Sequence, residues 1–203
     1  MVPKAAATKP GEETGATESV RDRILNTARE LFYREGVRAV GVDTVVAQSG
    51  VAKTSLYRWF PSKDALIAAV LEQEAQDRWH GWDRNIERSP PEPREQLRSQ
   101  LAGITRFISS PRYRGCPFMN ATIEFPDPEH PARKVATGVA VELRRRVREL
   151  VDRIEGVRDP AALTDQIVLL IDGAFSTAQC LGKDGPPQYL LRAADALLEA
   201  QVK

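Results

Sequence analysis

Apolar residues recur at intervals of three and four along most of the chain, which is the spacing of one face of an α-helix. No stretch alternates apolar and polar residues convincingly enough to predict a strand. The pattern therefore predicts an all-α protein of about nine helices. The expected helices cover residues 19–36, 42–49, 53–60, 62–89, 92–110, 117–124, 131–156, 159–181 and 187–201.

Residues that favour helix ends mark several of these boundaries. Ser19 and Ser62 stand where an N-cap side chain is expected. Asp159 followed by Pro160 is the usual N-cap with proline at the first helical position. Gly50 follows the second helix, at a turn that favours a positive φ.

The lengths of the predicted helices divide the chain into three parts. Residues 1–18 carry almost no bulky apolar side chain, which predicts a disordered tail. Three short helices over residues 19–65 predict a small N-terminal domain. The longer helices over residues 66–203 predict a larger bundle, joined to the small domain through the fourth helix.

The charge and cysteine content limit the classes of function. The chain has 29 Lys and Arg against 28 Asp and Glu, so nucleic-acid binding requires a local concentration of basic side chains. Two distant cysteines and the absence of an apolar signal segment favour a reducing, cytoplasmic setting. The most apolar stretch, 161–174, is interrupted by Asp165 and Asp172, so no membrane span is predicted.

Residues 42–60 have the spacing of a helix-turn-helix motif, with a glycine-containing turn between two short helices. No acidic residue lies between Asp43 and Asp64, whereas Lys53, Arg58 and Lys63 are basic. A locally positive face suits the phosphates of double-stranded DNA, and the second helix of such a motif enters the major groove.

Residues 50–66 read Gly-Val-Ala-Lys-Thr-Ser-Leu-Tyr-Arg-Trp-Phe-Pro-Ser-Lys-Asp-Ala-Leu. This segment resembles the signature of the TetR family of bacterial regulators, and the gapless match extends over about residues 19–70. Three residues depart from the family pattern. Ala52 replaces the usual Ser and loses an N-cap, Trp59 replaces Tyr or His, and Val46 stands where Ala is usual. These departures concern the details of docking and leave the predicted fold unchanged.

The resemblance implies a homodimer that binds a palindromic operator. It assigns backbone and phosphate contacts to Thr44, Lys53, Tyr57, Trp59 and Lys63, and base contacts to Thr54, Ser55 and Arg58. The alternative for Tyr57 and Trp59 is that their rings only cover the core of the small domain. The family dimerises through its last two long helices, which correspond here to residues 159–181 and 187–201.

The resemblance also implies a small-molecule pocket in the larger domain, whose occupation releases a repressor from DNA. The candidate lining residues are Trp79, Trp82, Phe107, Cys116, Phe118, Met119, Asn120, Phe175 and Gln179. Most of the aromatic residues among them are equally explained as core. The sequence does not identify the ligand, and it leaves repressor and activator open.

Several other features have competing explanations. Cys116 is a candidate redox sensor, or a nucleophile paired with His130, but no orienting third group accompanies such a pair. The basic run 144–148 is either a second nucleic-acid patch or a face neutralised by neighbouring acids. His80, His130 and the cysteines lack metal-ligand spacing. The sequence therefore predicts a regulator rather than an enzyme, with no metal or cofactor.

Overall fold

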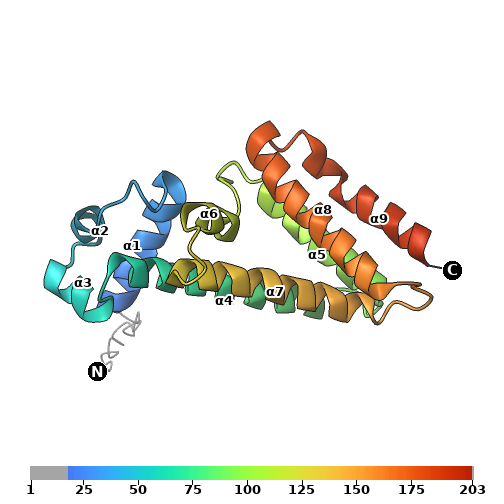
Figure 1. Cartoon of the computed structure of the whole chain (residues 1–203), viewed down its shortest axis with the longest axis horizontal. Coiled ribbons are helices and arrows are strands. Elements are labelled where there is room, and N and C mark those ends of the chain that lie inside the picture. The colour runs from blue at the N-terminus through green and yellow to red at the C-terminus, as the bar shows by residue number, and fades with distance from the viewer. Residues whose placement is uncertain (1–17, 203) are drawn as a thin grey trace, which may run out of the picture.

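A computed structural model describes residues 18–202, and within this range the chain folds into nine α-helices and one 3-10 helix without a β-strand (Figure 1). The only β-type pairing there is the isolated bridge between Val157 and Val202. The all-α fold predicted from the sequence is confirmed. The helices are α1 (Val20–Glu35), α2 (Val42–Ser49), α3 (Lys53–Trp59), α4 (Lys63–Glu87), α5 (Pro93–Ile108), α6 (Pro117–Glu124), α7 (Pro131–Val151), α8 (Pro160–Leu181), η1 (Pro186–Tyr189) and α9 (Leu190–Gln201).

Helices α1 to α3 form a small head at one end of the molecule (Figure 1). The Ser19 hydroxyl accepts the Asp22 N–H at 3.1 Å and so begins α1 as expected. The apolar stripe of α1 turns inward, with Ile24 and Ala28 fully buried. Val45 of α2 and Leu56 of α3 are also fully buried, and they join the same core. Burial of these faces fixes how the three helices cross.

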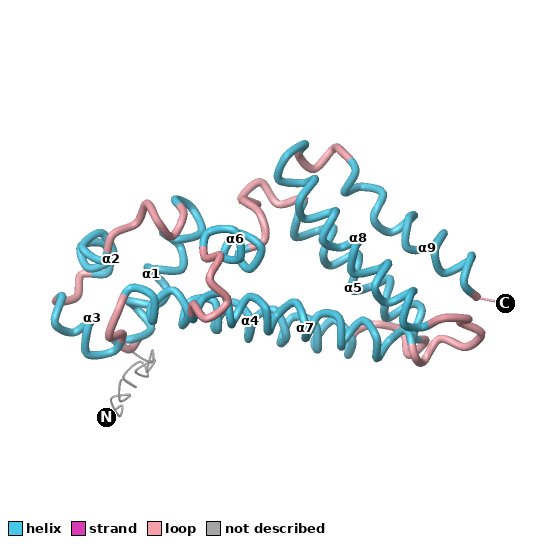
Figure 2. The backbone as a smooth tube through the Cα atoms, viewed as in Figure 1, coloured by secondary structure: helices cyan, strands magenta, loops and turns pink. Residues whose placement is uncertain are grey.

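Helix α4 leaves the head and runs alongside α7 (Figure 2). Ser62 caps it by accepting the Ala65 N–H at 3.0 Å. Its first half is buried against the head through Leu66, Ile67 and neighbouring residues. Its second half carries Trp79 and Trp82, which are partly buried against the bundle. One helix therefore belongs to both parts of the molecule.

Helices α5, α7, α8 and α9 make up most of the bundle, and α8 packs on both α7 and α9. The buried face of α8 carries Leu163, Ile167 and Ile171. Leu97 and Leu101 of α5 complete this core. None of the helices in residues 18–202 is both long enough and apolar enough to cross a bilayer.

Two helix ends differ from the prediction. Helix α7 ends at Val151 rather than at Gly156, because the following segment turns back to the end of the chain, where the Arg158 N–H donates to the Gln201 carbonyl at 3.0 Å. The last helical segment opens with the 3-10 turn η1 before α9 begins. The predicted tail lies, apart from Glu18, outside the described residues.

Candidate nucleic-acid interface and ligand cavities

The turn between α2 and α3 sets the position of the outward face of α3. Gly50 adopts φ 65° and ψ 24°, a left-handed conformation that glycine adopts at no steric cost. Leu56 and Phe60 then face the core of the head, at 0% and 3% exposure. Because these two residues point inward, the intervening side chains of α3 point to solvent.

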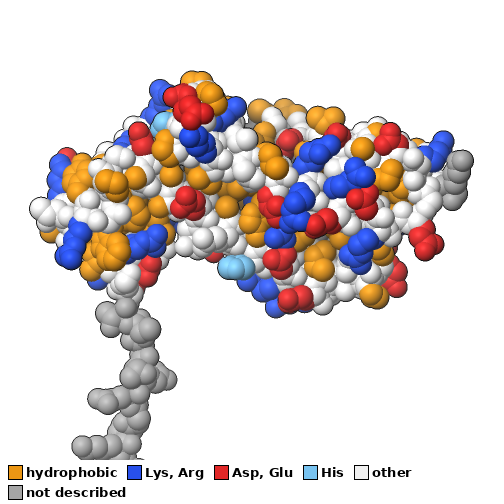
Figure 3. Space-filling view, turned by 60° about the horizontal axis from the view of Figure 1, so that its bottom comes forward, with side chains coloured by type: hydrophobic (Ala, Val, Ile, Leu, Met, Phe, Trp, Pro, Cys, Tyr) orange, Lys and Arg blue, Asp and Glu red, His pale blue; other side chains and the backbone are white. Residues whose placement is uncertain are grey.

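The outward face of α3 carries the residues for which DNA contacts were predicted. The rings of Tyr57 and Trp59 are 44% and 51% exposed, so they do not complete the core of the head. Arg58 and Thr54 are exposed, and Ser55 is partly buried. The other predicted contacts flank this face: Thr44 is exposed in the first turn of α2, Lys53 is exposed at the start of α3, and Lys63 is partly buried at the start of α4. Figure 3 shows basic side chains beside an apolar patch on the head.

Lys53 forms an ion pair with Asp43, the acidic residue that precedes the stretch without acidic side chains noted in the sequence. Its Nζ lies 2.7 Å from the Asp43 carboxylate on α2. This hydrogen bond and the charge of Asp43 raise the pKa of Lys53. The exposed ammonium therefore has to exchange Asp43 for a phosphate if it contacts DNA.

The three departures from the family pattern have distinct structural consequences. Ala52 is the N-cap residue of α3 and supplies no side-chain hydrogen bond. Val46 is partly buried and packs against the core without disturbing the left-handed turn at Gly50. Trp59 remains largely exposed, so its larger ring is available at the surface.

A cavity of about 520 Å³ lies between α4, α5 and α8, with the start of α6 at its edge; we call it the bundle cavity. Five of the predicted ligand residues line it: Trp79, Trp82, Phe107, Phe118 and Phe175. Four arginines also line it, and sequence reasoning did not propose them: Arg78, Arg84, Arg88 and Arg106. Arg78 and Trp82 are four residues apart on α4, so they share one face of the helix. This spacing could have predicted that arginine and aromatic side chains line the same cavity.

Arg78 lies among the aromatic side chains of the bundle cavity. Its guanidinium carbon is 4.7 Å from the ring centre of Phe118 and 5.6 Å from that of Phe175. One N–H donates to the Cys116 Sγ at 3.5 Å. Cys116 is buried and does not line the cavity itself, so its contact with the site runs through Arg78.

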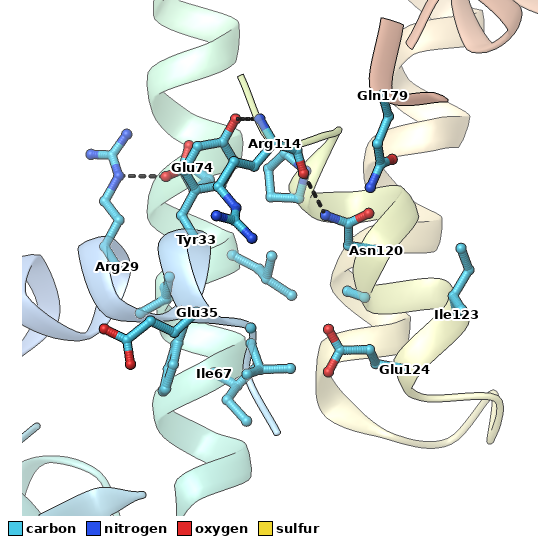
Figure 4. A pocket seen from close by; sticks show the side chains of 17 residues that line it. Arg29, Tyr33, Glu35, Ile67, Glu74, Arg114, Asn120, Ile123, Glu124 and Gln179 are labelled. Carbon is cyan, nitrogen blue, oxygen red and sulfur yellow. Dashed lines mark hydrogen bonds and ion pairs between the residues drawn. The ribbon is translucent and has the colours of Figure 1, made fainter. Parts of the chain in front are cut away.

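A second cavity of about 370 Å³ lies where α1, α4 and α6 meet, and we call it the junction cavity (Figure 4). Asn120 and Gln179 line this cavity and not the bundle cavity, whereas Met119 lines neither. The sequence grouped these residues into one candidate pocket, but the fold distributes them. Gly115 at its edge has φ 96°, and a Cβ there would lie 2.7 Å from Gln179 Oε1. The positive φ favours glycine here, and a side chain would also have to displace the flexible end of Gln179.

Hydrogen bonds beside the junction cavity connect the head to α6. The Tyr33 hydroxyl on α1 accepts the Arg114 N–H at 2.9 Å and donates to the Gly115 carbonyl at 3.4 Å. Arg38, in the loop after α1, donates to the carbonyl of Glu124 at the end of α6 at 2.5 Å. Both ends of α6 are therefore tied to the head.

The remaining candidate residues have structural partners. His130 caps α7 through its Nδ1, which accepts the Ala132 N–H at 3.2 Å, and its Nε2 lies 3.5 Å from Asp64. Both ring nitrogens therefore face partners other than Cys116. The basic run 144–148 is neutralised as the acidic neighbours suggested, through ion pairs that involve Asp83, Glu142, Glu149, Asp152 and Asp165. Within residues 18–202, no group of three or more potential metal ligands lies together.

Comparison with protein families matches two parts of the chain. Residues 24–70 match the family model described as bacterial regulatory proteins of the tetR family, and residues 93–194 match the model of the tetracyclin repressor-like C-terminal domain. The chain belongs to the TetR family. The family consists of transcriptional regulators, so the protein is a DNA-binding regulator and not an enzyme.

Individual relatives and solved structures agree with this TetR-family assignment. The regulator YjdC of Escherichia coli is 26% identical over 77% of this chain and 81% of its own length. The transcriptional activator FasR of Mycolicibacterium smegmatis is 30% identical over 82% of this chain and 74% of its own. The crystal structure of SCO4454, a TetR-family regulator of Streptomyces coelicolor, superposes with a TM-score of 0.82 at 32% identity, covering 91% and 96% of the two chains.

Proposed function

We propose that this TetR-family regulator is a cytoplasmic repressor that binds a palindromic operator as a homodimer and leaves it when a small molecule occupies the bundle cavity. The outward face of α3 carries the DNA-binding part of this proposal. An exposed arginine and two aromatic rings that are about half exposed, on a helix after a left-handed turn, suit a recognition helix.

The residues of the head take two kinds of role in this proposal. Arg58 reads a guanine in the major groove, a bidentate contact that discriminates by about 1–3 kcal/mol. Thr54 and Ser55 contact neighbouring base edges. Lys53, Tyr57, Trp59, Lys63 and Thr44 hold the DNA backbone, and each lost phosphate contact lowers the salt slope of binding by about 0.9.

The dimer interface in this proposal is the exposed face of α8 and α9. Leu169 on α8 is 70% exposed, which is unusual for an apolar side chain in the middle of a long helix. Gly173 and Ser176 extend this exposed face with small side chains, which permit close approach of a second copy. Light scattering should report a dimer for the natural protein and a monomer for Leu169→Glu. A dimer unaffected by this change would place the interface elsewhere.

Release from the operator proceeds in this proposal through α6. Phe118 of α6 lines the bundle cavity under the Arg78 guanidinium. The same helix is tied to the head through Tyr33 and Arg38. A ligand that moves Arg78 and Phe118 therefore displaces a helix that holds α1, which biases the spacing between the two recognition helices of a dimer.

Selection of binding sites from a random DNA duplex pool tests the DNA-binding proposal. The natural protein should enrich a palindrome with half-sites about 34–36 Å apart. Arg58→Ala should relax selection at one base pair per half-site. Arg112→Ala, which removes an exposed arginine between α5 and α6, serves as the matched control and should leave the palindrome unchanged. Binding that follows salt alone, without a palindrome, would overturn the proposal.

Activation of transcription is the second candidate, because the 30% identical relative FasR is named a transcriptional activator. A reporter placed behind the selected operator separates the two signs of regulation. Lower transcription in the presence of the protein supports repression. Higher transcription supports activation and leaves the proposed DNA contacts of the outward face of α3 unchanged.

A further inference from the structure

The bundle cavity has more positive than negative charge on its walls. Four arginines line it, at positions 78, 84, 88 and 106, and none of them has an ion-pair partner within residues 18–202. Two carboxylates also line it, Glu74 and Asp77. Arg29, which lies outside the cavity, binds both of them, at 2.5 Å and 2.7 Å. The four arginines are therefore not balanced by the acids beside them.

Asp172 of α8 also lies close enough to Arg78 for the two charges to interact. Desolvation raises the pKa of Asp172, and the neighbouring positive charge of Arg78 offsets this only in part. A carboxylate in a tight ion pair would show the opposite direction. Arg78 therefore has Cys116 Sγ as its hydrogen-bond acceptor, which is a weak partner for a guanidinium.

The aromatic rings of the cavity do not favour a cationic ligand, although such rings often bind cations. Arg78 already lies over Phe118 and Phe175. Arg146 of α7 lies 4.8 Å from the ring centre of Trp79, where it also binds Asp83 and Glu142. A cationic ligand would meet ring faces that carry a guanidinium already, and it would be repelled by the arginines that line the wall.

We propose that the bundle cavity binds an organic anion, with its carboxylate or phosphate on the guanidinium of Arg78 and its apolar or aromatic body among Trp82, Phe107 and Phe175. This inference rests on the proposed function for the location of the effector site and adds the chemical class of the effector. The planar guanidinium offers two parallel donors to such an anion. Arg84, Arg88 and Arg106, which are more exposed, attract the anion toward the cavity.

Calorimetric titration of the DNA-free protein with four probes of one shape tests the charge preference. The probes are 2-naphthoate, 2-naphthyl phosphate, the neutral 2-naphthamide and the cationic 2-naphthylmethylamine; octanoate adds an aliphatic anion. We expect at least one anion to bind about tenfold or more tightly than the amide, because a hydrogen bond to a charged partner is stronger than a neutral one. Comparison of the carboxylates with the phosphate identifies which anionic group fits.

Variants at Arg78 test whether this residue causes the preference for anionic over neutral probes. Arg78→Gln should reduce the ratio of anion to amide affinity to about twofold or less, and Arg78→Lys should keep part of it because the charge remains but the planar fork is lost. Arg112→Gln, which removes an exposed arginine outside the cavity, should leave the ratio unchanged. If Arg78→Gln does not fold, Arg106→Gln provides the second variant and should weaken anion binding alone.

The outcomes separate this inference from the proposed function. Equal binding of anion and amide, tighter binding of the amine, no anion binding, or an unchanged ratio in a folded Arg78→Gln would each overturn the inference. Arg78-dependent anion binding without release of the selected operator would support the inference and count against ligand-controlled release.

Discussion

Lys53, for which we propose a phosphate contact, already forms an ion pair in the protein without DNA, because its ammonium lies 2.7 Å from the Asp43 carboxylate. Both side chains are more than half exposed, so the pair is screened by solvent and contributes little to stability. Its main consequence concerns binding, because Asp43 competes with phosphate for Lys53 and places a negative charge beside the proposed DNA surface.

We predict that Asp43→Asn tightens DNA binding by about two- to fivefold at low salt, which corresponds to the free energy of an exposed ion pair. Fluorescence anisotropy with the selected operator measures this change. Glu30→Gln removes an exposed carboxylate from α1 in the same head and controls for net charge. An equal gain from both variants would show a general charge effect rather than release of Lys53.

Sequence reasoning placed the outward residues of α3 well and missed the partners of charged side chains. Periodicity fixes Leu56 and Phe60 inside, and the exposure of Tyr57 and Arg58 follows from that. The pairing of Lys53 with Asp43 depends on how α2 crosses α3, which periodicity does not encode. The arginines of the bundle cavity were missed for a similar reason, because arginine on a long helix is usually a solvated residue.

At the scale of the element, the turn between α2 and α3 depends on one backbone conformation. Gly50 has φ 65°, and a Cβ added there would meet no atom within 4 Å. The cost of a side chain at this position is therefore conformational and not a clash.

We predict that Gly50→Ala lowers the free energy of unfolding by about 1–2 kcal/mol, the penalty of the left-handed conformation. Gly50→Asn should cost less, because asparagine tolerates this region. Gly138→Ala is the control: Gly138 lies inside α7 with equally open space, so the change should be neutral or slightly stabilising. Urea denaturation measures all three variants, and equal losses at positions 50 and 138 would contradict the conformational explanation.

Helix α7 is tied to α4 by a charged network around Glu142. Hydrogen bonds from Arg145 and Arg146 outweigh the desolvation of Glu142 and lower its pKa from 4.5 to about 2. Arg146 also binds Asp83 of α4 at 2.5 Å. A carboxylate whose pKa falls on folding stabilises the protein above its unfolded-state pKa, and this stabilisation is lost as the pH falls toward the folded-state value.

We predict that the melting temperature of the natural protein falls between pH 4.5 and about 2 more steeply than that of Glu142→Gln. At neutral pH the variant should melt about 2–4 °C lower, the shift expected for roughly 1 kcal/mol in a chain of this size. Circular dichroism melts over this pH range provide the measurement. Glu149→Gln removes a more exposed carboxylate of the same network and should change the slope less; parallel curves for all three proteins would contradict the role of Glu142.

Helix boundaries were predicted best where the signal is local. Ser19, Ser62 and Asp159 each accept the backbone N–H three residues ahead, as their positions indicated. The end of α7 was predicted five residues too late, because Gly156 resembles a C-terminal signal. There the pairing of Val157 with Val202, distant in sequence, determines the chain path.

At the scale of the whole molecule, the sequence did not reveal how the candidate ligand residues divide between two cavities. Asn120 and Phe118 are two residues apart on α6, yet they face the junction cavity and the bundle cavity respectively. The division arises because α6 lies between the head and the bundle (Figure 1). In the proposed mechanism, this short helix with a cavity on each side connects a ligand in the bundle cavity to the head, in addition to α4.

The connection between α1 and α6 can be tested at Tyr33 of α1, because its hydroxyl forms hydrogen bonds with both Arg114 and Gly115 just before α6. We predict that Tyr33→Phe speeds hydrogen exchange of the Arg114 amide by about fivefold or more, since that N–H loses its acceptor. Tyr189→Phe, which alters an exposed ring far along the chain, should leave this amide unchanged. Exchange followed by mass spectrometry or NMR measures both.

Addition of the selected operator extends the test from a local bond to coupling between the two parts. If α1 transmits the DNA-bound state to α6, operator binding should slow exchange of the Arg114 amide in the natural protein, and this protection should be lost in Tyr33→Phe while operator affinity stays within about twofold. The ligand and the operator change each other's affinity through the same coupling free energy. A variant that loses this coupling should therefore need a higher ligand concentration for release from the operator. Operator protection that persists in Tyr33→Phe would assign the coupling to α4 instead, the other element shared by the head and the bundle.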